Sequence, residues 1–426
     1  MSWFIFALIC LLGWGFADLF YKKSNTGNDR YSHLRTAVWV GLIMGVTAFC
    51  FMPFTETQFD FVSLVVNAAK YSPASLSYII SMVIGYAGLR YLELSIVSPV
   101  QNASGALSAV FMFIYFSLTG HINSFWDEFS VLDIIGTVII VGGVIALAFV
   151  EQHLAKAEGE LNLPKEERKY RYGALALLFP ILYCVFDTIG TAADGVILDG
   201  DAGLGLGEID VIVLYGLTFL LAGIAAWIFL WIKEKKPYNP FNAHDLKTNL
   251  PAAIFEQFGQ IFYVYAMALK PMLAAPMVAS YCIVSVILSR IFLKEKLKKN
   301  QYACILAVII GIVILGISEG IAENNASYTD PVVEIVQAAY DSEGDYSELD
   351  GDYRDMVGEE VFAAMYVPVN GDAVVEDDTL KIDGNKTTVT YLVRDEDDNE
   401  LTFEAALEKD GDDLTIISVA PVTAEE

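Results

Sequence analysis

Histidine, cysteine and catalytic motifs are the scarce features of this 426-residue chain. Its 4 histidines lie in or beside expected loops. Its 5 cysteines lie in apolar segments without Cys-x-x-Cys spacing, so we expect free buried thiols and no metal site. Neither a nucleophile elbow nor a phosphate-binding loop is present in the sequence. The sequence therefore predicts that the chain is not an enzyme and holds no cofactor.

Long apolar segments fill the first 320 residues. Each is close to the ~20 residues with which an α-helix crosses about 30 Å of hydrocarbon. Because backbone polar groups cannot stay unpaired in lipid, we expect these segments to be helical. The sequence thus predicts an all-α polytopic membrane protein with ten transmembrane helices. The segments are Trp3–Tyr21, His33–Met52, Ser72–Arg90, Ser95–Leu118, Val131–Val150, Tyr172–Ala192, Ile209–Ile232, Ala252–Leu269, Leu273–Leu293 and Tyr302–Ile317.

Lys and Arg lie almost entirely on alternate loops of this first region, those after the first, third, fifth, seventh and ninth segments. The intervening loops contribute only Lys70 and Lys270. By the positive-inside rule, the basic loops are cytoplasmic. The N- and C-termini are then predicted to lie outside the cell, in a multi-pass protein of the plasma membrane.

The region after residue 320 has a different composition. It holds 29 acidic and 5 basic residues, and so contributes most of the chain's net charge of −27. Such acidity argues against binding nucleic acid or anionic lipid. Asp330 and Pro331 resemble a helix start, and Val332–Tyr340 and Tyr353–Met365 resemble short helices. Strand-like runs follow between Asp/Gly/Asn turns, which predicts a small α+β domain with an antiparallel meander. The predicted strands are Thr379–Ile382, Thr387–Val393, Leu401–Leu407 and Leu414–Val419.

The ten segments divide into two similar sets of five. Because five is odd, the second set enters the bilayer from the opposite side, which predicts an inverted repeat with a binding site near the midplane. The recurring features are Asp18 and Asp187, each four residues after an aromatic residue, the helix-opening prolines Pro99 and Pro276, and the glycines Gly142 and Gly311. The expected domains are 1–151 (first repeat), 152–171 (cytoplasmic linker), 172–319 (second repeat), 320–330 (linker) and 331–426 (acidic α+β domain).

These features resemble the EamA branch of the drug/metabolite transporter superfamily. The resemblance rests on the Trp14-Gly15 pair followed by Lys22 and Lys23, on the proline-opened fourth and ninth segments, and on Leu293–Leu297, which is similar to a family signature. The corresponding stretch of the first half, Leu118–His121, lacks the glutamate of that signature. The resemblance covers residues 1 to about 320. It implies two five-helix bundles around a central cavity lined by the first, third, fourth, sixth, eighth and ninth helices.

Carboxylates inside membrane helices are functional candidates because a charge in hydrocarbon is costly. Asp18 and Asp187 are predicted to couple transport to protons or to contact a cationic group, with an interfacial, solvated position as the alternative. Glu256 shares a helix face with Gln260 and Tyr263, and either lines a cavity or reaches the cytoplasmic surface. The other predicted substrate contacts are Trp14, Tyr86, Gln101, Asn102, Tyr183, Ser280 and Tyr281, and the predicted helix bends are Pro99 and Pro276.

Two functions follow from this pattern. The first is a secondary-active permease or exporter that moves a small metabolite or drug-like solute by alternating access, and the resemblance favours export. The second is a membrane-anchored sensor or adaptor whose acidic outer domain binds a ligand or partner. The sequence leaves open the solute, the coupling ion and whether the chain forms a homodimer.

Overall fold

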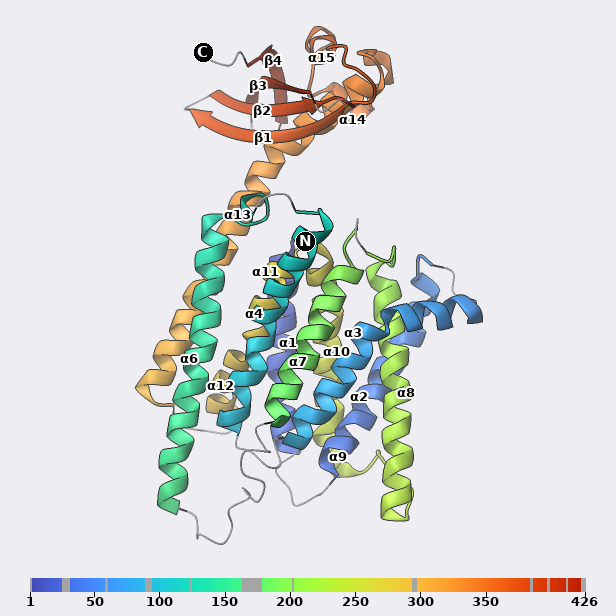
Figure 1. Cartoon of the computed structure of the whole chain (residues 1–426), viewed down its shortest axis with the longest axis vertical. Helices are drawn as coiled ribbons and strands as arrows, with labels where there is room; N and C mark the ends of the chain where they lie inside the picture. The colour runs from blue at the N-terminus through green and yellow to red at the C-terminus, as the bar shows by residue number, and fades with distance from the viewer. Residues whose placement is uncertain are drawn as a thin grey trace. The chain divides into compact units, whose positions relative to one another are not determined.

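A computed structural model gives the fold of residues 2–24, 31–57, 60–88, 94–122, 125–162, 178–200, 203–292, 297–383, 386–396, 399–410 and 413–422. The chain divides into two compact units, Met1–Ser318 and Glu319–Glu426 (Figure 1). Each unit has its own hydrophobic core.

Helices build the first unit, and each predicted apolar segment lies in one or two of them wherever the structure describes it, apart from the turn at Ser280. The long helices are α1 (Trp3–Ser24), α2 (Ser32–Phe51), α3 (Phe61–Gly88), α4 (Leu94–Thr119), α6 (Val131–Asn162), α7 (Leu178–Ile197), α8 (Glu208–Glu234), α10 (Asn249–Leu269), α11 (Pro271–Ala279), α12 (Tyr281–Phe292) and α13 (Lys299–Asp341). The short ones are the 3-10 turn Met52–Phe54, α5 (Phe125–Glu128) and α9 (Ala243–Lys247). α9 lies at the end of the unit opposite the N-terminus (Figure 1).

Small residues let the central helices approach closely. α1 packs against α10, α3 against α7, and α2 against α8. At the α2–α8 crossing, Gly41 lies against the backbone of Gly223, and a Cβ on either glycine would meet the other helix's backbone. The Gly41-x-x-x-Gly45 spacing thus serves helix packing, as small-xxx-small patterns do in membranes.

The outer face of the first unit is apolar. Leu118, Leu221 and Ile232 are 82%, 68% and 69% exposed. A water-soluble protein rarely exposes so much apolar surface, whereas a bilayer solvates it. Among the described residues, five helices are long and apolar enough to cross a membrane, namely Trp3–Tyr21, Ser32–Phe54, Glu208–Glu234, Pro271–Phe292 and Lys299–Asp341.

Several helices differ from the sequence prediction in their bounds or continuity. α3 begins at Phe61 and contains Pro73, and α7 continues to Ile197, past the expected end at Ala192. The ninth predicted segment is two helices, because the chain turns at Ser280 between α11 and α12. Pro276 lies inside α11, four residues before this turn, and Pro99 lies within α4.

The second unit is an α+β domain, as predicted. Its strands β1 (Val374–Asp383), β2 (Lys386–Arg394), β3 (Glu400–Asp410) and β4 (Asp413–Pro421) form one antiparallel sheet in the order β1-β2-β3-β4. The expected helix Tyr353–Met365 is two short helices, α14 (Gly351–Arg354) and α15 (Glu359–Met365). Alternate residues of the strands, such as Val389, Tyr391 and Val393, face the core with Phe362.

The segment predicted as the linker 320–330 is helical, because α13 runs through it and continues to Asp341. The polar residues there are compatible with a helix. Pro331 lies inside α13 and so is not its first residue. A proline normally costs about 3 kcal/mol in a helix interior, and the burial of Val332, Ile335 and Val336 directly after it offsets that cost. Similarly, α6 covers the start of the predicted linker 152–171 as far as Asn162, and 163–177 lie outside the described residues.

Candidate functional site

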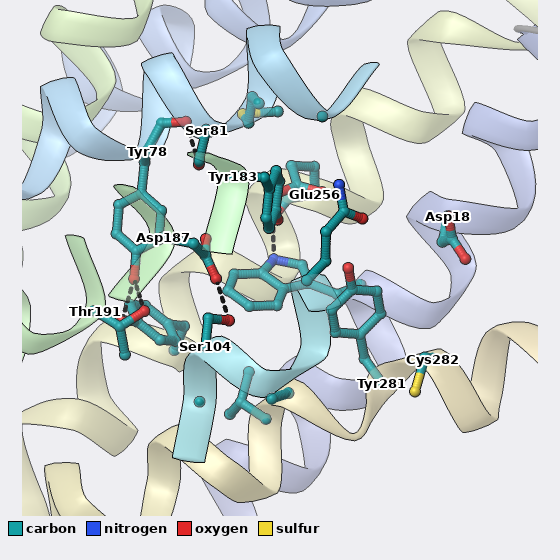
Figure 2. Close-up of a pocket in the computed structure, with 18 of the residues that line it drawn as sticks. Asp18, Tyr78, Ser81, Ser104, Tyr183, Asp187, Thr191, Glu256, Tyr281 and Cys282 are labelled. Carbon is teal, nitrogen blue, oxygen red and sulfur yellow. Dashed lines mark hydrogen bonds between the residues drawn. The ribbon is translucent and has the colours of Figure 1, made fainter. Parts of the chain in front are cut away.

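A cavity of about 160 Å³ lies in the first unit between α1, α3, α4, α7, α8, α10, α11 and α12 (Figure 2). By the same measure of volume, a cavity that holds one water has about 10–15 Å³. The cavity therefore has room for a small solute. Nine of the twelve residues predicted to contact a substrate line it: Trp14, Asp18, Gln101, Tyr183, Asp187, Glu256, Gln260, Tyr263 and Tyr281.

The other three predicted residues are Ser280, Tyr86 and Asn102. Ser280 is fully buried at the turn between α11 and α12, where its hydroxyl donates to the Met277 carbonyl at 2.6 Å, and it does not line the cavity. Tyr86 and Asn102 lie within α3 and α4, but their side chains are outside the described part of the structure.

Helical spacing gathers the site on a few faces. On α1, Trp14, Asp18 and Tyr21 follow the i, i+4, i+7 pattern that places residues on one side of a helix. On α7, Tyr183, Asp187 and Thr191 lie at i, i+4 and i+8; on α10, Glu256, Gln260 and Tyr263 repeat the α1 spacing. These three faces of α1, α7 and α10 all line the same cavity.

The two aspartates have equivalent partners. Ser104 of α4 donates a hydrogen bond to a carboxylate oxygen of Asp187 on α7 at 2.6 Å (Figure 2). Ser285 of α12 donates likewise to Asp18 on α1. In each case one partner lies on a helix before residue 162 and the other on a helix after residue 178, so the two contacts join distant parts of the sequence at the cavity.

Glu256 lines the cavity, as the first of its two predicted positions requires. The Tyr21 hydroxyl donates to the Glu256 carboxylate at 3.3 Å, and the Trp14 indole N–H donates to the Glu256 backbone carbonyl at 3.3 Å. α1 and α10 are thus joined at this residue by polar contacts as well as by packing.

Aromatic rings form much of the cavity wall. Trp14 stacks on Tyr263, with ring centroids 5.2 Å apart and planes 28° from parallel. Tyr281 meets the edge of Trp14 at 5.9 Å. The Tyr78 hydroxyl bonds to those of Tyr263 and, at 2.9 Å, Thr191. These rings offer π faces and hydroxyl groups to a bound solute.

Two glycines make room for the aromatic residues. A Cβ on Gly259 of α10 would collide with the indole of Trp14, and a Cβ on Gly85 of α3 would lie 2.6 Å from the Tyr183 ring. Each aromatic residue stands four positions before the aspartate of its helix. The position of Trp14 therefore depends on Gly259 of α10, and that of Tyr183 depends on Gly85 of α3.

Sequence reasoning missed the buried Asp194, because the sixth predicted segment ends at Ala192, two residues before it. In the structure Asp194 belongs to α7 and is fully buried, and the Tyr71 hydroxyl donates to it at 2.7 Å. The i+7 spacing from Asp187 puts Asp194 on the same side of α7 and was the available signal. Tyr78, Ser81, Ser104, Tyr215 and Ser285 are further cavity residues that were not predicted as contacts.

Comparison with known proteins agrees with this architecture. Residues 202–317 match the model of the EamA-like transporter family. The match confirms the resemblance to the EamA branch and is consistent with a membrane protein of the drug/metabolite transporter superfamily. Together with the apolar helices, it indicates a multi-pass membrane protein related to transporters of small solutes, a family that is typically not enzymatic.

Similarity beyond the family model concerns the fold alone. A solved structure described only as "Crystal structure of protein" aligns with a TM-score of 0.50 at 12% identity, covering 74% of this chain and 96% of that chain. No curated protein matches the sequence.

Proposed function

We propose that the chain is a secondary-active permease that moves a small metabolite or drug-like solute across the plasma membrane by alternating access. The observation that carries this proposal is the cavity itself, because both halves of the first unit contribute its polar and aromatic lining. In transporters built from inverted repeats, the solute site lies near the midplane at the interface of the repeats.

Helix packing supports two inverted five-helix repeats. The first and eighth long helices, α1 and α10, pack together, and their counterparts under the repeat, α7 and α3, do so as well. α2 packs on its own counterpart α8. The two aspartate–serine bonds are related in the same way, because α7 with α4 carries one bond and their counterparts α1 and α12 carry the other. With ten spans, the basic loops would be cytoplasmic and both termini would lie outside.

The break between α11 and α12 is a further feature of a solute path. Residues on both sides of it, such as Ala275 and Tyr281, line the cavity. Discontinuous helices at the centre of a membrane protein commonly border substrate sites, because their ends leave polar backbone groups that need a partner. We place the moving elements of the transport cycle at this break.

Asp18 and Asp187 are proposed to couple solute movement to protons. Each lies at the cavity, and each is held by a serine of the other half. A change in the protonation of either group would alter a contact between the halves. Export is the direction that the family resemblance favours.

Comparative metabolomics tests the proposal. Cells expressing the intact chain would be compared with cells expressing the Asp18→Asn/Asp187→Asn double variant, inside and outside, at equal membrane levels. We expect a small set of compounds to shift with the intact chain only. Asp60→Asn is the matched control, because Asp60 is an exposed aspartate outside the cavity that accepts a bond from the Ser63 amide.

The outcomes separate the claims. Identical shifts with the intact chain and the double variant would retain transport but remove the role of the two aspartates. Unchanged compound levels across several growth media would contradict transport itself.

A membrane-anchored sensor or adaptor is the second candidate, and the separate core of the unit Glu319–Glu426 favours it. Transport by the first unit does not obviously require such a domain. Deletion of residues 325–426 discriminates between the two functions. A transporter keeps moving its solute after the deletion, whereas a sensor loses its output.

A further inference from the structure

Acidic side chains characterise the lining of the cavity. Asp18, Asp187 and Glu256 all line it, on α1, α7 and α10, and Figure 2 shows the three side chains around the same space. Among the described residues that line it, none is Lys, Arg or His. Asp187 and Glu256 accept hydrogen bonds from the neutral hydroxyls of Ser104 and Tyr21. Carboxylates in such a place are costly unless a positive group accompanies them.

The remaining wall suits the body of an organic molecule. Trp14, Tyr263 and Tyr281 form a cluster of stacked and edge-on rings, which can bind a cation through their π faces. A metal cation would instead need converging oxygen ligands, and the described residues hold no group of three or more His, Cys, Asp or Glu side chains placed for a metal.

One amide adds an independent indication of a ligand. Gln260 lines the cavity and is only 2% exposed, yet its Nε2 has no hydrogen-bond partner among the described residues. A buried donor without a partner is energetically unfavourable, because it has lost its hydrogen bonds to water without replacement. A bound molecule with a hydrogen-bond acceptor would satisfy it.

We propose that the solute is a small organic cation, an amine or quaternary ammonium that carries an apolar or aromatic group. The cationic centre lies by Asp187 and Glu256, the apolar part stacks on the Trp14–Tyr263–Tyr281 cluster, and an acceptor on the solute meets Gln260. This inference rests on the proposed transport function for its biological role, but binding is testable without transport. A carboxylate or phosphate solute is disfavoured, because like charge opposes it.

Three probes with one aromatic ring test the charge preference: benzyltrimethylammonium, benzyl alcohol and phenylacetate. Each is equilibrated by dialysis against the purified full-length chain in detergent, with protein-free micelles of the same detergent correcting for uptake into micelles. The Asp187→Asn/Glu256→Gln double variant is measured in the same way. We expect saturable binding of benzyltrimethylammonium, about tenfold or more tighter than that of the other two. Equal binding of all three probes, or tighter binding of phenylacetate, would overturn the inference.

Single variants locate the site. Asp187→Asn and Glu256→Gln are each expected to weaken benzyltrimethylammonium binding about tenfold or more, and Asp60→Asn to leave it unchanged. Full affinity in both single variants and in the double variant contradicts the site. Gel filtration checks that each variant elutes as a single folded species. If a variant does not fold, the three-probe comparison on the unmodified chain decides whether the site prefers a cation.

Transport and charge class can fail separately. If the metabolomic comparison finds a neutral or anionic solute, transport stands and the cationic class is wrong. If benzyltrimethylammonium binds as expected but no compound shifts in cells, the cation site stands and the transport function is contradicted.

Discussion

The hydroxyl of Ser104 on α4 donates a 2.6 Å hydrogen bond to the carboxylate of Asp187 on α7, joining the two halves of the helical unit at the cavity. Ser285 on α12 and Asp18 on α1 repeat this contact with the halves exchanged. In the alternating-access cycle that we propose, the two halves move against each other, and these two contacts lie where that movement would alter them.

Replacement of Ser104 by Ala removes the donor and leaves the Asp187 carboxylate without it. A hydrogen bond to a charged group contributes about 1.5–3 kcal/mol, so we expect a loss of that order in the free energy of unfolding in SDS titrations. Ser104→Thr keeps a hydroxyl and is expected to lose less. Equal stability of the Ala variant and the unmodified chain would show that the bond contributes nothing.

Replacement of Gly259 by Ala forces a Cβ into the indole of Trp14. Overpacking of this kind costs about 1–3 kcal/mol, and displacement of Trp14 from Tyr263 should shift the tryptophan emission maximum. Gly142→Ala is the matched control, because a Cβ there meets no atom within 4 Å. An alanine at a compatible helical position stabilises by about 0.4–1 kcal/mol. Similar thermal unfolding of the two variants would contradict the packing argument.

Much of the helical fold could be predicted from hydropathy, because a bilayer demands long apolar segments. The extension of α7 past Asp194 could not, since the Tyr71 hydroxyl of α3 satisfies the buried Asp194 only in the folded chain. The start of α3 at Phe61 was not visible in hydropathy either. Asp194 looks like a loop residue until Tyr71 is brought beside it. The length of α13 was also not predictable from composition, because the polar residues after Ile317 suggest the end of a helix. Val332 and Ile335 are buried in the second unit, and the helix continues to them.

The cavity could be predicted in part. Trp14, Asp18, Tyr183 and Asp187 were visible because polar and aromatic residues at helical spacing are unusual within apolar segments. Their partners were not visible, because Ser104 acquires its role only when α4 meets α7. A serine in a membrane helix otherwise fits helix packing equally well.

Tyr71 and Asp194 form a buried pair whose coupling a double-mutant cycle can measure. Tyr71→Phe removes the 2.7 Å donor to a fully buried carboxyl group, and we expect a loss of about 1–3 kcal/mol. In Asp194→Asn the same tyrosine loses its carboxylate acceptor. The combined variant should cost less than the sum of the two single variants. Additive losses in SDS unfolding would mean that the two side chains act independently.

The second unit should unfold through its own core. Phe362 is fully buried in α15 and meets Tyr346 edge-on at 5.7 Å. Phe362→Ala removes this ring, and truncations of buried phenylalanines cost about 3–5 kcal/mol. Hydrogen exchange in β1–β4 should therefore rise strongly, whereas Ile417→Ala, at a side chain that is 50% exposed, should change it little. All 6 tryptophans lie before residue 232, so tryptophan fluorescence reports the first unit alone. We expect its unfolding transition to stay unchanged in Phe362→Ala, because the two hydrophobic cores are separate clusters. A matching shift of the tryptophan transition would instead show that the two cores unfold together.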